Sequence, residues 1–191
     1  MSFKAIHPFI HEYDFPFRDE FVNHQDEIIK QFNEKLDSSN KDNRENYTVV
    51  YQNAALQQTV QQRLDNLINE NYAVSPRIKP TSMNIYLQNN KHSANLWHDH
   101  VLTSTINAVI YFNLPKSGGG FEYNYQGDIS QLQPKEEKIY LLPYWLLHRP
   151  LPQQDEDYRI CINLEYLCQA RPMHKHQVSW FAPNQPINIV W

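Results

Sequence analysis

The stretch Ile106-Asn107-Ala108-Val109-Ile110-Tyr111-Phe112-Asn113-Leu114 is short, largely apolar and rich in β-branched and aromatic residues. A run of this composition and length favours a β-strand over a helix. Similar short runs, in which apolar and polar residues alternate, recur from Thr81 onward: Met83 to Leu87, Lys138 to Leu142, Tyr158 to Leu167 and Ile187 to Val190. Because clusters of Gly, Pro, Asn and Gln separate these runs, this half of the chain is predicted to form the many short strands of a sandwich or barrel.

The preceding residues follow a helical period instead. Phe21, Ile28, Phe32 and Leu36 recur at near-helical spacing over about residues 18–36. Over about residues 54–70, five apolar residues share one helix face: Leu56, Val60, Leu64, Leu67 and Ile68. Each pattern predicts an amphipathic helix with one buried face. Two helices followed by many strands predict an α+β fold in which the helices pack on one sheet of a β-jelly-roll.

The composition sets limits on organisation and on partners. With 41% hydrophobic and 20% charged residues, the chain is globular, and we expect one domain over residues 1–191, with helical support over about 1–80 and a jelly-roll core over about 81–191. The formal net charge of −4 makes nucleic acid an unlikely partner. Two cysteines, no membrane-spanning apolar run and no signal-peptide pattern lead us to expect a cytoplasmic protein without a membrane partner.

Three histidines form the most informative motif. His98 and His100 lie two residues apart in Trp97-His98-Asp99-His100, so on a strand both imidazoles face the same side. His148 ends the apolar run that starts at Ile139, and a later strand can bring it to the same point. Neutral imidazole suits Fe, Zn, Cu and Ni. The motif predicts a metal centre; alternatively, His148 is a core histidine with a backbone partner.

Two further features qualify this interpretation. A second H-x-H pair, His174 and His176, is flanked by polar residues typical of a surface turn, so the H-x-H pattern alone is weak evidence. Arg159, which follows His148 along the chain, offers a planar bidentate clamp for a carboxylate and suggests a small acid as co-substrate. The alternative is a surface ion pair with the acidic loop 155–157, worth about 0–1 kcal/mol.

Taken together, the order and spacing of several segments resemble the iron(II)- and 2-oxoglutarate-dependent oxygenases, in particular their small members from phages and marine bacteria. The resemblance runs from about Met83 to Tyr166. The segments that carry it are Asn84-Ile85-Tyr86, Trp97-His98-Asp99-His100, Ala108 to Pro115, Gly118-Gly119-Gly120-Phe121-Glu122-Tyr123, Leu142 to Pro150 and Tyr158-Arg159-Ile160-Cys161-Ile162-Asn163.

This resemblance implies a double-stranded β-helix and the activity of a dioxygenase that hydroxylates its substrate. It implies that His98, His100 and His148 hold Fe(II), and that 2-oxoglutarate chelates the iron through its 1-carboxylate and 2-oxo groups. Arg159 would then pair with the far carboxylate of 2-oxoglutarate. Tyr86 would hydrogen-bond the co-substrate, with Asn84 beside it. Dioxygen and an unidentified substrate complete the set of partners, and succinate is released.

The sequence departs from the family pattern at two places. The usual ligand set is His-x-Asp…His, whereas His100 stands here in place of the carboxylate. Strand alternation points the nearby Asp99 away from His98, which leaves Asp99 the role of a partner that orients an imidazole N–H. Cys161 supplies a weak thiol donor where a serine or threonine hydroxyl is frequent. Either His100 completes a competent three-histidine site, or iron binding is weakened in favour of another metal or an inactive relative.

Three functions therefore compete. The first is an Fe(II)- and 2-oxoglutarate-dependent hydroxylase acting on a protein side chain or a small molecule. The second is a cupin-like three-histidine metalloenzyme that uses no 2-oxoglutarate, although no glutamate follows the H-x-H pair within Val101 to Thr105 as in typical cupins. The third is a non-catalytic jelly-roll binding module. The substrate and the oligomeric state are not indicated by the sequence.

Overall fold

The computed structural model describes residues 3–7, 9–38, 48–49, 53–71, 74–76, 82–90, 96–101 and 103–170. This part of the chain forms a mixed α and β structure with antiparallel sheets. Its elements are, in chain order, β1 (Phe3–His7), β2 (Ile10–Asp14), α1 (Arg18–Ser38), β3 (Thr48–Val49), α2 (Ala54–Asn71), β4 (Val74–Pro76), β5 (Ser82–Gln88), β6 (Ile106–Asn113), β7 (Phe121–Tyr125), β8 (Asp128–Leu132), β9 (Lys138–Pro143), β10 (Leu147–Pro150), β11 (Arg159–Tyr166) and β12 (Cys168–Ala170).

A large sheet forms the centre of the structure, with strand order β1-β2-β9-β6-β11-β5-β3. Side chains alternate across its central strands. Those facing the helices are apolar and fully buried, as in Ile110 of β6 and Ile162 of β11. Those facing the other side include the polar Asn107 and Asn163, which are also buried. The two faces of this one sheet therefore have different roles, since one builds the core and the other carries polar groups.

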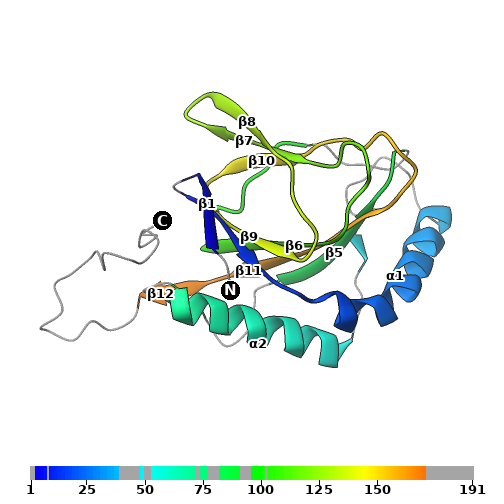
Figure 1. Ribbon diagram of the computed structural model, residues 1–191, viewed down its shortest axis with the longest axis horizontal. Helices are drawn as coiled ribbons and strands as arrows, with labels where there is room; N and C mark the ends of the chain where they lie inside the picture. The colour runs from blue at the N-terminus through cyan, green and yellow to red at the C-terminus, as the bar shows by residue number, and fades with distance from the viewer. Residues whose placement is uncertain are drawn as a thin grey trace, which may run out of the picture.

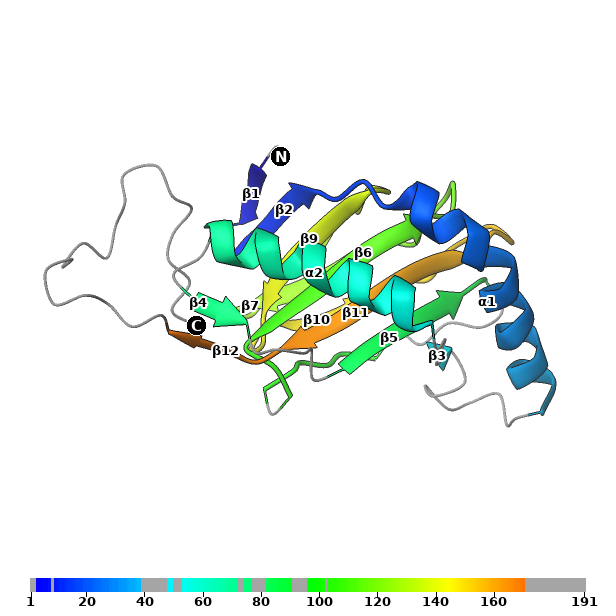
Figure 2. The same ribbon diagram turned by 90° about the horizontal axis from the view of Figure 1, so that it is seen from below.

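The two helices cover the apolar face of the large sheet, and α2 runs across its strands (Figure 1 and Figure 2). The predicted helix faces are confirmed: the buried residues are Phe21, Ile28 and Phe32 in α1, and Leu56, Val60, Leu64, Leu67 and Ile68 in α2. The side chain of Leu36 is outside the part of the chain that the structure describes. Asn53 begins α2, because its Oδ1 accepts a hydrogen bond from the backbone N–H of Leu56 at 2.9 Å.

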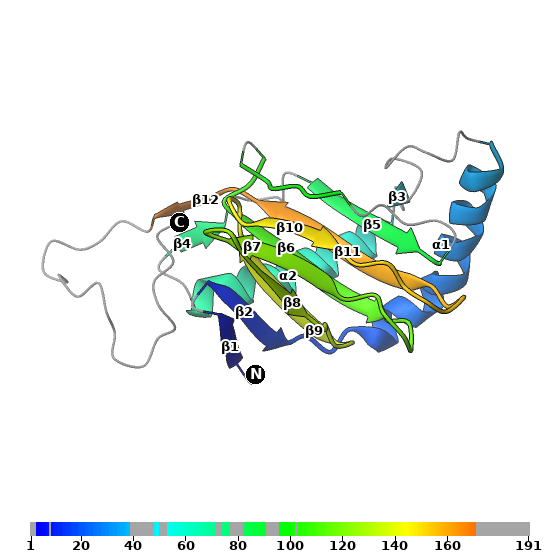
Figure 3. The same cartoon turned by 90° about the horizontal axis from the view of Figure 1, so that it is seen from above.

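A three-stranded sheet, β10-β7-β8, lies over the opposite face of the large sheet (Figure 3). The segment around His98 extends this small sheet, because His98 forms an antiparallel bridge with His148 of β10. A third, two-stranded sheet pairs β12 with β4. The small sheet thus covers the polar face of the large sheet, and the space between the two sheets is enclosed by strands on both sides.

The observed strands β5, β6, β9 and β11 confirm four of the predicted runs, whereas Ile187 to Val190 lies outside the described residues. The predicted helical support over about 1–80 requires a correction, because β1 and β2 of this region join the large sheet. Ile10, His11 and Glu12 of β2 are all buried, so β2 has no alternating pattern to reveal it. No helix in the described part of the chain is long and apolar enough to cross a membrane.

Candidate metal centre

His98 and His148 are held side by side by their own backbones. The backbone N–H of each residue donates to the carbonyl oxygen of the other at 2.9 Å. Residues paired in this way across an antiparallel bridge project their side chains to the same face. The ring centroids are 4.4 Å apart. The backbone pairing alone therefore places these two imidazoles together.

His100 joins them because it follows His98 at i+2. Its backbone N–H donates to the carbonyl of Tyr144 at 2.8 Å, which fixes the chain beyond the bridge. The His100 ring lies 5.4 Å from that of His98 and 5.3 Å from that of His148, between centroids. One ring nitrogen from each histidine lies within 4.8 Å of the other two. Three side chains from two separated segments thus converge on a volume the size of one cation.

The hydrogen bonds of the rings fix their tautomers. Nδ1 of His98 and of His148 lies 2.9 Å and 2.7 Å from the carbonyl oxygens of Leu96 and Leu146. Nδ1 of His100 lies 2.8 Å from Oε1 of Glu165. Carbonyl and carboxylate oxygens only accept hydrogen bonds, so each Nδ1 carries a proton and Nε2 is the nitrogen whose lone pair is available to a metal ion. These donors suit a metal ion such as iron(II) or zinc.

Asn107 approaches the same centre from β6. Its Nδ2 lies 3.0 Å from Nε2 of His100, which agrees with a lone pair on that nitrogen. The Oδ1 of Asn107 is buried without a hydrogen-bond partner. A metal ion on Nε2 of His100 would displace this amide donor.

The sequence suggested Asp99 as the carboxylate that orients an imidazole N–H, but the structure places Glu165 there instead. Asp99 is exposed, and its Oδ1 accepts a hydrogen bond from the backbone N–H of Val101 at 3.2 Å. Glu165 of β11 holds the imidazole N–H instead. The second H-x-H pair, His174 and His176, lies outside the described residues.

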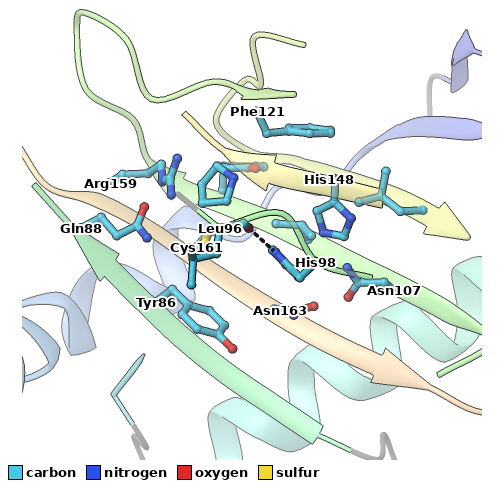
Figure 4. A pocket seen from close by; sticks show the side chains of 14 residues that line it. Tyr86, Gln88, Leu96, His98, Asn107, Phe121, His148, Arg159, Cys161 and Asn163 are labelled. Carbon is cyan, nitrogen blue, oxygen red and sulfur yellow. Dashed lines mark hydrogen bonds between the residues drawn. The ribbon is translucent and has the colours of Figure 1, made fainter. Parts of the chain in front are cut away.

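A cavity opens beside the histidines between the two layers of strands. Figure 4 shows Arg159 and Gln88 on one side of this cavity and His98 and His148 on the other. Its walls are formed by Tyr86, Gln88, Leu96, His98, Asn107, Val109, Tyr111, Phe121, Leu142, His148, Pro150, Arg159, Cys161 and Asn163. The large sheet supplies most of these residues from its polar face.

Arg159 brings a buried positive charge to this cavity. Its side chain is 4% exposed, so it is not the surface ion-pair partner of the alternative interpretation. One terminal nitrogen, Nη1, donates to the carbonyl oxygens of Gly119, Gly120 and Leu151 at 3.3–3.4 Å. Its Nε is buried without a hydrogen-bond partner. Buried charges are normally paired, so this geometry suits an anionic group bound in the cavity.

The glycine run 118–120 orients Arg159. Gly118 and Gly119 have φ angles of +77° and +72°, a region that L-residues rarely adopt. A Cβ on Gly119 would lie 2.3 Å from Cγ of Pro115. The carbonyl oxygens of this glycine run position the guanidinium of Arg159.

Substituting Gly119 with alanine is expected to destabilise the fold by about 1–3 kcal/mol, because it adds a strained φ and a steric overlap. It should also weaken anion binding at Arg159, since the carbonyl of Gly119 would move. Gly127→Ala is the matched control: its φ is +97°, but nothing lies within 4 Å of its Cβ position. Chemical denaturation and titration with 2-oxoglutarate measure the two effects. Equal ligand affinity in both variants would contradict this role of Gly119.

Neutral donors line the wall between Arg159 and the histidines. Tyr86 of β5 lies opposite Cys161 of β11, and Asn84 lies opposite Asn163 in the next inward-facing row. Tyr86 lines the cavity, whereas Asn84 is not among the lining residues. Burial raises the pKa of Tyr111 and of the Cys161 thiol, while Arg159 acts in the opposite direction on both. Both groups therefore stay protonated at neutral pH.

Several residues of this site escaped the sequence analysis: Gln88, Asn107, Asn163, Glu165 and Tyr111. A signal for some of them was present. Once Arg159 is taken as inward-facing, the period of a strand places Cys161, Asn163 and Glu165 on the same side. The polar residues Asn107 in β6, and Asn163 and Glu165 in β11, interrupt otherwise apolar strands and thereby indicate a polar face.

The fold is shared with solved oxygenases, and 107 chains match it. AviO1 from Streptomyces viridochromogenes Tue57 has a TM-score of 0.59 and 13% identity, with 86% of this chain and 90% of that chain covered. A viral collagen prolyl hydroxylase from Paramecium Bursaria Chlorella virus-1 has a TM-score of 0.55 and 10% identity, with 86% and 96% covered. A prolyl-4-hydroxylase from Pseudomonas putida has a TM-score of 0.52 and 13% identity, with 87% and 97% covered.

Many of the matched structures are 2OG-Fe(II) oxygenases, so the resemblance seen in the sequence is confirmed at the level of the fold. Some matched structures are longer than this chain, which spans 59% of one and 48% of another. No protein-family model matches the sequence, and no curated protein does either.

Proposed function

We propose that this chain is an Fe(II)- and 2-oxoglutarate-dependent dioxygenase, built as one double-stranded β-helix domain, that hydroxylates a protein side chain or a small molecule. The observation that carries the proposal is the set of side chains that line a single cavity. Three imidazoles with Nε2 lone pairs stand at one side of it, and a buried guanidinium with an unpaired Nε stands at the other.

The metal would be held by His98, His100 and His148. Their Nδ1 atoms are all engaged with protein acceptors, which is the arrangement that orients metal-binding histidines. When bound, iron(II) and 2-oxoglutarate together supply the chemistry that couples decarboxylation to the hydroxylation of a C–H bond.

The protein's own residues would bind and orient the co-substrate. Arg159 would receive its far carboxylate through charge-assisted hydrogen bonds. Tyr86 and Tyr111 line the same cavity, and the protonated hydroxyl of Tyr111 is suited to donate to a carboxylate oxygen. Asn84, beside Tyr86 on β5, would assist from the edge of the site. A matched viral collagen prolyl hydroxylase has been crystallised as its complex with 2OG, which supports this choice of co-substrate.

The test is an anaerobic titration with Fe(II) followed by 2-oxoglutarate. We expect a visible metal-to-ligand charge-transfer band that forms only after 2-oxoglutarate is added, and succinate release once oxygen is admitted. Iron binding without the band would instead favour the cupin-like three-histidine enzyme, for which the all-histidine ligand set is the specific argument. No metal uptake would favour the non-catalytic binding module.

A further inference from the structure

The proposed metal centre has an unusual charge for an iron site of this fold. The two-histidine, one-carboxylate arrangement places a negative charge directly on the metal. Here the corresponding position is His100, and the nearby Asp99 is exposed and turned to the backbone of Val101. Three neutral imidazoles would leave the cation without an anionic ligand.

Glu165 stands where it can offset this difference. Its Oε1 accepts a hydrogen bond from Nδ1 of His100 at 2.8 Å, on the side of the ring opposite Nε2. The His100 side chain is 6% exposed and that of Glu165 14% exposed, so solvent screens the contact only weakly. Residues 100 and 165 are far apart in the sequence. The pairing of β11 with β6 sets Glu165 opposite Asn107, which also contacts the His100 ring.

The contact is specific to one of the three rings. His98 and His148 donate their Nδ1 protons to the backbone carbonyls of Leu96 and Leu146. The ring at the position of the missing carboxylate differs from these two, because its Nδ1 donates to a carboxylate. Such a partner fixes the ring orientation and tautomer and makes Nε2 a stronger ligand.

We propose that Glu165 is a positioning residue that supplies, through the imidazole of His100, the carboxylate which the metal centre lacks as a direct ligand. The inference rests on the metal centre of the proposed function but not on its use of 2-oxoglutarate. It explains how a histidine can replace the usual carboxylate and still leave an iron-binding site.

The first test measures metal affinity directly. Glu165→Gln should raise the Kd for Mn(II) or Co(II), measured by calorimetry in the absence of 2-oxoglutarate, by about 10- to 100-fold. The matched control is Glu122→Gln. Glu122 is a carboxylate of similar burial, with a side chain 10% exposed against 14% for Glu165. It is paired with Arg149 and Gln131, and it lies on the opposite face of β7 from Phe121, which lines the cavity. This control should bind both metals like the wild type.

A spectroscopic readout separates positioning from a general loss of structure. In the Co(II)-loaded protein, the ring N–H protons of bound histidines give exchangeable, strongly shifted proton resonances. We expect three such resonances in the wild type and a change in only one of them, that of His100, in Glu165→Gln. Glu165→Asp retracts the same carboxylate by one methylene and should give an intermediate Kd, which provides a second variant if Glu165→Gln does not fold.

The outcomes separate this inference from the proposed function. Wild-type metal affinity in Glu165→Gln, or an unchanged set of three resonances, would overturn the role of Glu165 while leaving the metal centre in place. A wild-type protein that binds metal but gives no charge-transfer band with 2-oxoglutarate would overturn the proposed function while leaving the role of Glu165 intact.

Discussion

Replacing His148 with alanine is expected to raise the Kd for Fe(II) by more than about 100-fold. Losing a residue that only hydrogen-bonds a metal ligand already raises the Kd by up to about 100-fold. A direct ligand contributes more than such a partner. The fold should persist, because the hydrogen bonds that pair residues 98 and 148 belong to the backbone. Anaerobic calorimetry with Fe(II), or with Mn(II) as a stable substitute, measures the change.

The control for this substitution is His24→Ala. His24 is a half-buried histidine on α1 and does not line the cavity. Its removal should leave the Kd for metal unchanged. If His148→Ala and His24→Ala bound metal equally well, the three histidines of the cavity would not be the ligands.

Replacing Arg159 with methionine is expected to raise the Kd for 2-oxoglutarate roughly 30-fold or more, since truncating one partner of a buried charge pair costs about 2–5 kcal/mol. Metal content should stay at the wild-type level, because Arg159 and the histidines lie on different sides of the cavity (Figure 4). The measurement is the dependence of the charge-transfer band on 2-oxoglutarate concentration at saturating Fe(II).

Arg149→Met provides the comparison for Arg159. Arg149 pairs with Glu122 and lies over the ring of Trp97, outside the cavity. Its loss should leave the 2-oxoglutarate dependence unchanged. A wild-type dependence in Arg159→Met would remove Arg159 from co-substrate binding and reopen the three-histidine alternative.

Local periodicity carried much of the fold prediction. The apolar period of α2 and the short runs that became β6 and β11 were visible because each buries at least one apolar face. The strands β2 and β8 were not predicted, for opposite reasons. β2 is buried on nearly all sides, whereas the residues of β8 are mostly exposed. Neither pattern alternates, so side-chain periodicity gives no signal for either strand.

The site was accessible to sequence reasoning where spacing is local. His98 and His100 share a face because two residues separate them on an extended chain. The partner of His100 was not accessible in this way, because Glu165 lies on β11, far along the chain, and meets His100 only in the folded structure. The carbonyl oxygens that bind the guanidinium of Arg159 could not be predicted either. Their positions depend on the backbone path of the glycine run and not on side-chain type.

The most direct test is a crystal structure of the protein grown with Mn(II) and 2-oxoglutarate under anaerobic conditions, with anomalous data collected for the metal. We predict one anomalous peak within bonding distance of Nε2 of His98, His100 and His148, and a carboxylate of 2-oxoglutarate against the guanidinium of Arg159. A metal bound elsewhere, or a cavity in which Arg159 contacts no carboxylate, would contradict the assignment of this chain as a 2-oxoglutarate-dependent oxygenase.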